Sequence, residues 1–290
     1  MALEVNVNKV KAIAKKEFMD NVRNKWVLAL SVIFLLLVIL MSYFGGATGG
    51  GNVEFQGFKA TVASLSTIAS MLLPIIAIML GYSTIIGERE NGSLGVVLGC
   101  PVSRFDVILG KFLGLGGVLA VTIFLGFGVS GVIVGTMTGF ADGLAYLLFM
   151  VLTVLFATFF LGFSIFMSAI ASKRSTAIAG GLAIFFSGMI AGTVLMGIWV
   201  ATGGDMGAMM EQAMAGQMPQ LPDWYWGGMF FSFMDIYPMG AMELFNTTDF
   251  MGYTMDYPWF VNAPIVFAWF LFLTTATFLA SVFVFGKKDI

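Results

Sequence analysis

Long runs of apolar residues dominate the chain, and short polar stretches separate them. Six runs have the length of a membrane span, namely residues 26–44, 61–86, 112–137, 143–170, 176–200 and 263–285. A helix needs about 20 mostly apolar residues to cross the hydrocarbon core of a bilayer. The runs are apolar on every face, whereas the strands of a membrane β-barrel alternate apolar and polar residues. The pattern therefore predicts an all-α polytopic membrane protein in which residues 1–290 form a single transmembrane domain.

Residues 5–25, ahead of the first run, have the pattern of an amphipathic helix. Apolar residues recur there at helical spacing: Val10, Ile13, Ala14, Phe18 and Val22. Basic residues occupy most of the remaining positions: Lys9, Lys11, Lys15, Lys16, Arg23 and Lys25. Such a helix lies in the membrane interface, where its cations meet anionic lipid headgroups. The alternative is a solvated helix with no membrane role; the interfacial position is favoured because the segment runs directly into a span.

Composition narrows the function classes. The chain is 59% hydrophobic and 10% charged, against about 25% charged residues in a soluble domain. It contains no His and a single Cys, Cys100, so an internal disulfide, a His/Cys metal site and a His-based catalytic triad are all excluded. The six apolar runs hold no Asp, Glu, Lys or Arg. Ion-coupled carriers keep such groups inside the membrane, so the chain is not expected to be one.

Basic residues also predict the orientation. All of the 14 lysines and arginines except Lys59 fall on the side of the two termini. The positive-inside rule then places both termini and the loops 87–111 and 171–175 in the cytoplasm. Residues 201–262 are placed outside the cell, and they contain seven acidic residues and no basic one.

The loop at residues 87–111 carries the most informative pattern. Asn91-Gly92 interrupts the preceding helix, and Ser93 can cap a short helix over residues 94–98. Pro101 ends that helix, and Ser103 can cap a second one that begins at Arg104 and runs towards the third span. A short helix at the end of a span is suited to dock on a soluble protein and pass its movement on. The alternative for these charges is headgroup contact and positive-inside bias.

This loop resembles a known family. Its acidic–basic–acidic triplet at residues 88–90, the Gly-Ser-Leu step at 92–94, the Pro-Val-Ser-Arg at 101–104 and the Gly-Lys at 110–111 follow one another in the order and spacing found in the membrane subunits of ABC-2 type exporters. Within that family the chain looks most like the permeases grouped with multi-copper-enzyme maturation systems. The resemblance implies that these residues couple the chain to an ATPase: Glu88, Arg89, Glu90, Gly92, Ser93, Leu94, Pro101, Val102, Ser103, Arg104 and Lys111.

The resemblance also implies a function and partners. The chain would be the permease subunit of an exporter in the plasma membrane of a prokaryote, paired with a second permease in a homodimer or heterodimer and with two copies of a cytoplasmic ABC ATPase. ATP and Mg would bind only in that ATPase, because the P-loop pattern needs a glycine where this chain has Phe105. The chain itself is expected to have no cofactor, no catalytic site and no nucleic-acid partner. The absence of charge in the spans favours an amphipathic or lipid-like cargo.

A second function remains open. The chain can instead be a non-transporting membrane protein that couples an intracellular ATPase to an extracellular partner, which would bind the outer segment 201–262. In either case that segment is a candidate surface for a protein outside the cell.

The outer segment is rich in methionine and aromatic residues. Met206, Met210, Met214 and Met218 follow one another at helical spacing, and thioethers are ligands for Cu(I). Methionine also packs well against irregular apolar surfaces, and this is the favoured interpretation. The segments 235–238 and 246–248 are predicted to separate short outer helices.

Two Gly-x-x-x-Gly pairs lie within the spans, at residues 131–135 and 188–192. Small residues let membrane helices approach closely. The pairs can mark a dimer face or a mobile seam, but packing within the chain is the favoured interpretation.

Overall fold

The computed structural model describes residues 6–44, 58–92, 95, 101–140, 142–214, 221–246, 249–250, 253–254 and 257–287. Its long helices are α1 (Val7–Val22), α2 (Lys25–Phe44), α3 (Phe58–Gly81), α6 (Arg104–Thr138), α7 (Gly143–Ile170), α8 (Arg174–Ala201) and α12 (Ala263–Lys287). The shorter helices are α4 (Ile86–Glu90), α9 (Met206–Met214), α10 (Asp223–Met229) and α11 (Phe233–Glu243). Two-residue strands β1 (Asp249–Phe250) and β2 (Tyr253–Thr254) pair antiparallel.

Five stretches of the described residues are long and apolar enough to cross a membrane: Thr61–Glu90, Arg104–Thr136, Gly143–Ile170, Arg174–Ala201 and Ala263–Lys287. A sixth is formed if α1 and α2, which meet at a bend of 71°, are taken together. The prediction of an all-α polytopic membrane protein is confirmed. The depth of each helix in the bilayer stays a prediction.

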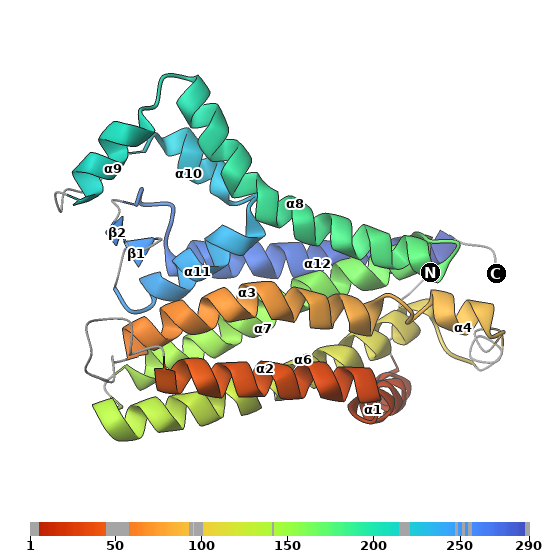
Figure 1. Cartoon of the computed structure of the whole chain (residues 1–290). Helices are drawn as coiled ribbons and strands as arrows, with labels where there is room; N and C mark the ends of the chain where they lie inside the picture. Colours follow the sequence, from red (N-terminus) through yellow and green to blue (C-terminus); the bar gives the residue numbers. More distant parts are fainter. Residues whose placement is uncertain are drawn as a thin grey trace.

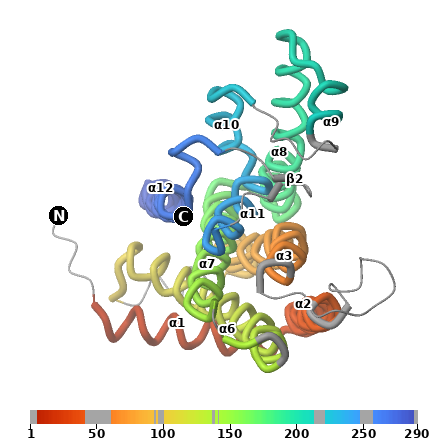
Figure 2. Tube along the Cα trace, turned by 90° about the vertical axis from the view of Figure 1, so that its left-hand side faces the viewer, coloured from red at the N-terminus to blue at the C-terminus, as the bar shows by residue number. Residues whose placement is uncertain are grey.

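Helix α7 forms the centre of the bundle, and α3, α6, α11 and α12 pack around it (Figure 2). Its buried aromatic side chains hold α11 in place. The ring of Phe156 stacks on that of Tyr237 with centroids 4.3 Å apart, and the hydroxyl of Tyr237 lies 2.8 Å from Thr153 Oγ1. Part of the outer segment is thus a component of the core.

Helix α8 begins beside the bundle and diverges from it towards the end that bears α9 and α10 (Figure 1). The opposite end gathers α1, α4 and the C-terminal end of α12 (Figure 1). This second end, called here the inner end, is the one that the charge pattern assigns to the cytoplasm.

Helix α6 begins at Arg104, where the second helix of the coupling loop was predicted, and includes the third predicted span, which was placed from residue 112. A capping box explains the early start. Ser103 Oγ accepts a hydrogen bond from the Asp106 backbone at 3.0 Å, and Asp106 Oδ2 accepts one from the Ser103 backbone at 3.4 Å. Each side chain satisfies a backbone donor that the helix end would leave free. Ser103 therefore caps the helix as predicted, but that helix continues without a break into the third predicted span.

A further prediction was wrong at residues 235–238. Helix α11 runs through Asp235 and Pro238, because the contacts of Tyr237 with α7 hold the helix in spite of the proline. The chain does turn after α11, at Asn246, whose φ is 51°.

Both predicted glycine pairs pack within the chain. A Cβ on Gly131 would lie 2.5 Å from the Tyr146 ring, and one on Gly135 would overlap the Phe140 ring. The positions of Gly188 and Gly192 lie against the first turn of α11. This agrees with the favoured interpretation.

Candidate functional site

Helix α1 packs across the start of α6, on a face of α6 that is formed by glycines. A Cβ on Gly110 would lie 2.7 Å from Ile13 Cβ, and one on Gly114 would lie 2.6 Å from the carbonyl oxygen of Ala14. The glycines let the two backbones approach closely. The apolar residues Ile13 and Phe18 of α1 are therefore turned towards α6, and the exposed face of α1 carries Lys11 and Lys15.

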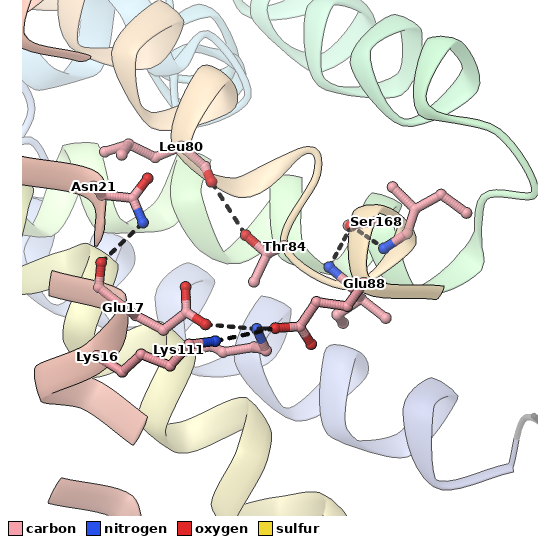
Figure 3. A network of polar contacts seen from close by, with 10 residues as sticks. Lys16, Glu17, Asn21, Leu80, Thr84, Glu88, Lys111 and Ser168 are labelled. Carbon is pink, nitrogen blue, oxygen red and sulfur yellow. Dashed lines mark hydrogen bonds and ion pairs between the residues drawn. The ribbon is translucent and has the colours of Figure 1, made fainter. Parts of the chain in front are cut away.

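Lys111 joins three helices at this contact (Figure 3). Its side chain is 3% exposed, and its Nζ lies 2.7 Å from Glu17 Oε1 of α1 and 2.8 Å from Glu88 Oε1 of α4. Lys16 Nζ approaches the same Glu88 oxygen at 3.9 Å. Two lysines thus balance two glutamates, which makes burial of the central ammonium tolerable. We call Lys16, Glu17, Glu88 and Lys111 the inner hub.

The hub adds two details that the sequence did not reveal. Lys111, the last residue of the predicted coupling loop, is buried within α6. Glu17 was not singled out, although it is 9% exposed and completes the site. A signal was present: Glu17 falls seven residues after Val10, on the apolar face of its helix.

Helix α4 is also tied to α7 and α8. The backbone N–H groups of Ile85 and Ile86 donate to Ser168 Oγ at 3.0 and 3.1 Å. Glu90 pairs with Arg174 at 2.7 Å, with both side chains about 40% exposed. Arg89 donates to the carbonyl oxygen of Ala171 at the end of α7.

The start of α6 is fixed separately. Arg104 Nη1 donates to the carbonyl oxygens of Phe285 and Gly286 at 2.8 and 3.0 Å, which ties α6 to the last turn of α12. A basic side chain at this place satisfies carbonyls that the helix end leaves unpaired. Lys9 of α1 donates to the carbonyl oxygen of Pro101.

These contacts sort the predicted coupling residues into two sets. Glu88, Arg89, Arg104 and Lys111 are engaged with other helices and are at least partly buried. Glu90, Gly92, Pro101 and Ser103 are exposed, as is Asn91 beside them, although Glu90 also pairs with Arg174. Val102 is partly buried against the core. Gly92 has a φ of 71°, a left-handed conformation that favours glycine. Ser93 and Leu94, like most of the predicted helix at residues 94–98, lie outside the described residues.

Two of the four candidate copper-binding methionines have described side chains. Met206 and Met210 are 47% and 52% exposed on α9, whereas the side chain of Met214 and all of Met218 lie outside the described residues. The described residues also contain no group of three or more His, Cys, Asp or Glu that could hold a metal ion.

Comparison with known proteins identifies the family. The model of ABC-2 family transporter proteins matches residues 11–290. The chain belongs to the ABC-2 family. It is a multi-pass membrane protein that corresponds to the permease domain of that family.

Two curated relatives carry the name probable ABC transporter permease protein NosY. The one from Stutzerimonas stutzeri is 35% identical over 184 residues, which is 62% of this chain and 66% of that protein. The one from Pseudomonas aeruginosa is 38% identical over 178 residues, which is 60% of this chain and 64% of that protein. The match thus spans slightly less than two thirds of the length of either relative.

Proposed function

We propose that this chain is the permease subunit of an ABC-2 type exporter and that a separate cytoplasmic ATPase drives it through helix α4. One observation carries the proposal. The inner hub holds α4 against α1 and α6 by ion pairs, while the end of α4 at residues 90–92 stays exposed. A docking element needs both an exposed surface and a rigid connection to the parts that it moves.

The engaged and the exposed residues then have different roles. Glu90, Asn91 and Gly92 are the candidate contacts with the ATPase, and Pro101 and Ser103 lie exposed on the same loop. The hub residues position this surface without touching the partner. Because Glu88 is joined to Lys111, and Ile86 to Ser168, a displacement of α4 passes into α6 and α7.

The remaining parts of the proposal rest on the family resemblance. Two permeases and two ATPases assemble in the plasma membrane of a prokaryote with both termini of this chain in the cytoplasm, and ATP and Mg bind in the ATPase. An amphipathic or lipid-like cargo fits spans without charged residues, and the outer segment is available to a protein outside the cell.

The test compares Glu90→Gln with Arg174→Gln. The pair that they form is well exposed, and such pairs contribute about 0–1 kcal/mol, so both variants are expected to fold. Each would be purified in mild detergent from membranes that also contain the native ATPase, and the bound ATPase and its turnover would be measured. We expect Glu90→Gln to lose most of the bound ATPase and Arg174→Gln to keep it.

Two results would contradict the proposal. An equal loss in both variants would mean that the ion pair positions α4 and that Glu90 is not a contact. A wild-type chain that is recovered without any soluble ATPase, across several detergents, would remove the basis for an externally driven permease.

A further inference from the structure

The glycine pair of α8 receives the first turn of α11. The position of a Cβ on Gly192 is filled by the Asp235 carboxyl group, and a Cβ on Gly188 would lie 3.2 Å from the Phe233 ring. Ser232, which precedes α11, is fully buried at this contact. Any larger residue at 192 would separate the two helices, so the glycine places an acidic side chain directly on the backbone of a candidate span.

Ser232 and Asp235 form a short chain of hydrogen bonds that ends on α8. Ser232 Oγ lies 2.9 Å from the carbonyl oxygen of Gly188 and within hydrogen-bond distance of Asp235 Oδ2. A hydroxyl group has one hydrogen and can donate only one such bond. If Asp235 is ionised, the single hydrogen of the Ser232 hydroxyl can serve only one of these two contacts. The other contact would then bring two acceptor oxygens together with no hydrogen between them.

A proton on Asp235 resolves this conflict. The carboxylic acid then donates to Ser232 Oγ, and the Ser232 hydroxyl donates to the Gly188 carbonyl oxygen, so that every contact holds one hydrogen. Burial raises the pKa of Asp235, and the hydrogen bond from Ser232 opposes that shift. The count of hydrogens and the burial of Asp235 therefore both favour the protonated carboxyl group.

Helix α8 and the outer segment offer no nearby cation to stabilise a carboxylate. Helix α8 has Arg174 as its only ionisable residue, at its opposite end, and residues 201–262 contain no Lys or Arg. Helix α10 contributes Asp223 and Tyr225; the pKa of Tyr225 is raised to about 12, first by burial and then by the charge of Asp235. Helix α11 itself adds Tyr237 and Glu243.

The helices that pack behind α11 carry few ionisable residues. Helix α3 has Lys59 in its first turn and is followed by Tyr82, α7 has Tyr146, and α12 has Lys287 at the inner end. The described side chain that bonds to the Asp235 carboxyl group is Ser232.

We propose that Asp235 is protonated in this structure and that its neutral carboxyl group fastens α11 to α8 in a pH-dependent manner. At higher pH the carboxylate forms, the hydrogen-bond chain loses its proton, and α8 is released from the first turn of α11. The fastening concerns a span that otherwise diverges from the bundle (Figure 1). It does not depend on the proposed contact with an ATPase, which lies at the other end of the molecule.

The sign of the effect follows from linkage. A carboxyl group whose pKa is raised on folding binds more protons in the folded chain than in the unfolded chain. The stability of the contact is then greatest in mildly acidic buffer and falls as the pH rises through the folded pKa. Asp235→Asn replaces the acid by a neutral amide that can also donate to Ser232, so this variant should keep the contact at every pH.

The experiment uses the full chain in lipid nanodiscs. Infrared spectra would be recorded from mildly acidic to mildly alkaline buffer for the wild type, Asp235→Asn and Asp223→Asn, the last being a matched control at an exposed aspartate on α10. Hydrogen exchange of residues 233–243 would be followed in the same samples. We expect the wild type to show a protonated-carboxyl band that disappears as the pH rises and that Asp235→Asn lacks from the start, whereas Asp223→Asn keeps it.

Exchange gives an independent readout. As the pH rises towards the folded pKa of Asp235, exchange in the wild type should rise by up to about tenfold per pH unit beyond its intrinsic pH dependence, because one pKa unit corresponds to 1.36 kcal/mol. Above that pKa the folded and the open chain bind the same number of protons, so the additional rise should stop. Asp235→Asn should show only the intrinsic dependence. A wild-type spectrum without the band in mildly acidic buffer, or identical exchange profiles in wild type and Asp235→Asn, would overturn the proposal. If Asp235→Asn does not fold, the pH titration of the wild type against Asp223→Asn still decides.

Discussion

Replacing Lys111 by methionine tests whether the inner hub is held by charge. The change keeps a long unbranched side chain and removes only the ammonium group. Glu17 and Glu88 would then be left facing each other, although their side chains are only 11% and 17% exposed. Removing one partner of a buried ion pair costs about 3–5 kcal/mol, because the remaining charge is left buried without compensation.

We expect Lys111→Met to lower the free energy of unfolding by that amount, which is about two to four powers of ten in the unfolding equilibrium. The measurement is denaturant unfolding of the full chain in bicelles, followed by tryptophan fluorescence. The control is the triple variant in which Lys111→Met is combined with Glu17→Gln and Glu88→Gln. A buried charge cluster that is replaced as a whole is often neutral in stability, so the triple variant should recover most of the loss.

Two outcomes would refute this reasoning. The free energy of unfolding of Lys111→Met can lie within about 0.5 kcal/mol of the wild type, which is the size expected for an ordinary surface change. In that case the hub is hydrated and does not fasten α1 to α4. If the triple variant is as unstable as the single one, the loss comes from altered packing around residue 111 and charge is not its cause.

The remaining predictions concern the helices that meet at the hub. Gly114→Ala should displace α1 from α6 at a cost of about 1–3 kcal/mol, seen as faster proteolysis of α1. Gly128→Ala on the same helix, where a Cβ meets nothing within 4 Å, should leave the digestion pattern unchanged; equal digestion of both variants would contradict the close contact. Ser168→Ala removes the acceptor of two backbone donors at the start of α4, each worth about 1–3 kcal/mol when buried. Hydrogen exchange there should rise about five- to a hundredfold, and unchanged exchange would show that water replaces the hydroxyl.

Much of the architecture could be predicted from the sequence because lipid imposes a simple rule. Apolar runs of the right length mark helices, and the fourth predicted span, residues 143–170, coincides with α7 at both ends. The cap at Ser103 was also predictable, since it depends on residues three positions apart. These features depend on residues that are close together in the sequence, so the sequence is enough to predict them.

The inner hub could not be derived in the same way. It joins Glu17, Glu88 and Lys111, which are far apart in the sequence, and its geometry depends on how closely α1 approaches α6. The basic residues of α1 predicted a contact with the membrane surface. The contact with α6 is made instead by Glu17, the buried acidic residue of α1. Helix α11 shows the same limit: Pro238 predicts a break, but packing against α7 overrides the local preference.

The structure also indicates where movement at the inner end can appear. Glu17 and Glu88 share one ammonium group, so α1 and α4 cannot leave α6 independently without exposing a buried charge. An ATPase that pushes on the exposed end of α4 would therefore move α1, α4 and the start of α6 as one unit. That unit meets α8 through an exposed ion pair, whose energy is small, and through a small apolar contact between Ile86 and Ala177. Movement between the hub and α8 is thus the least costly. Further along α8, the contact with α11 through Asp235 determines whether α8 moves with the bundle or separates from it.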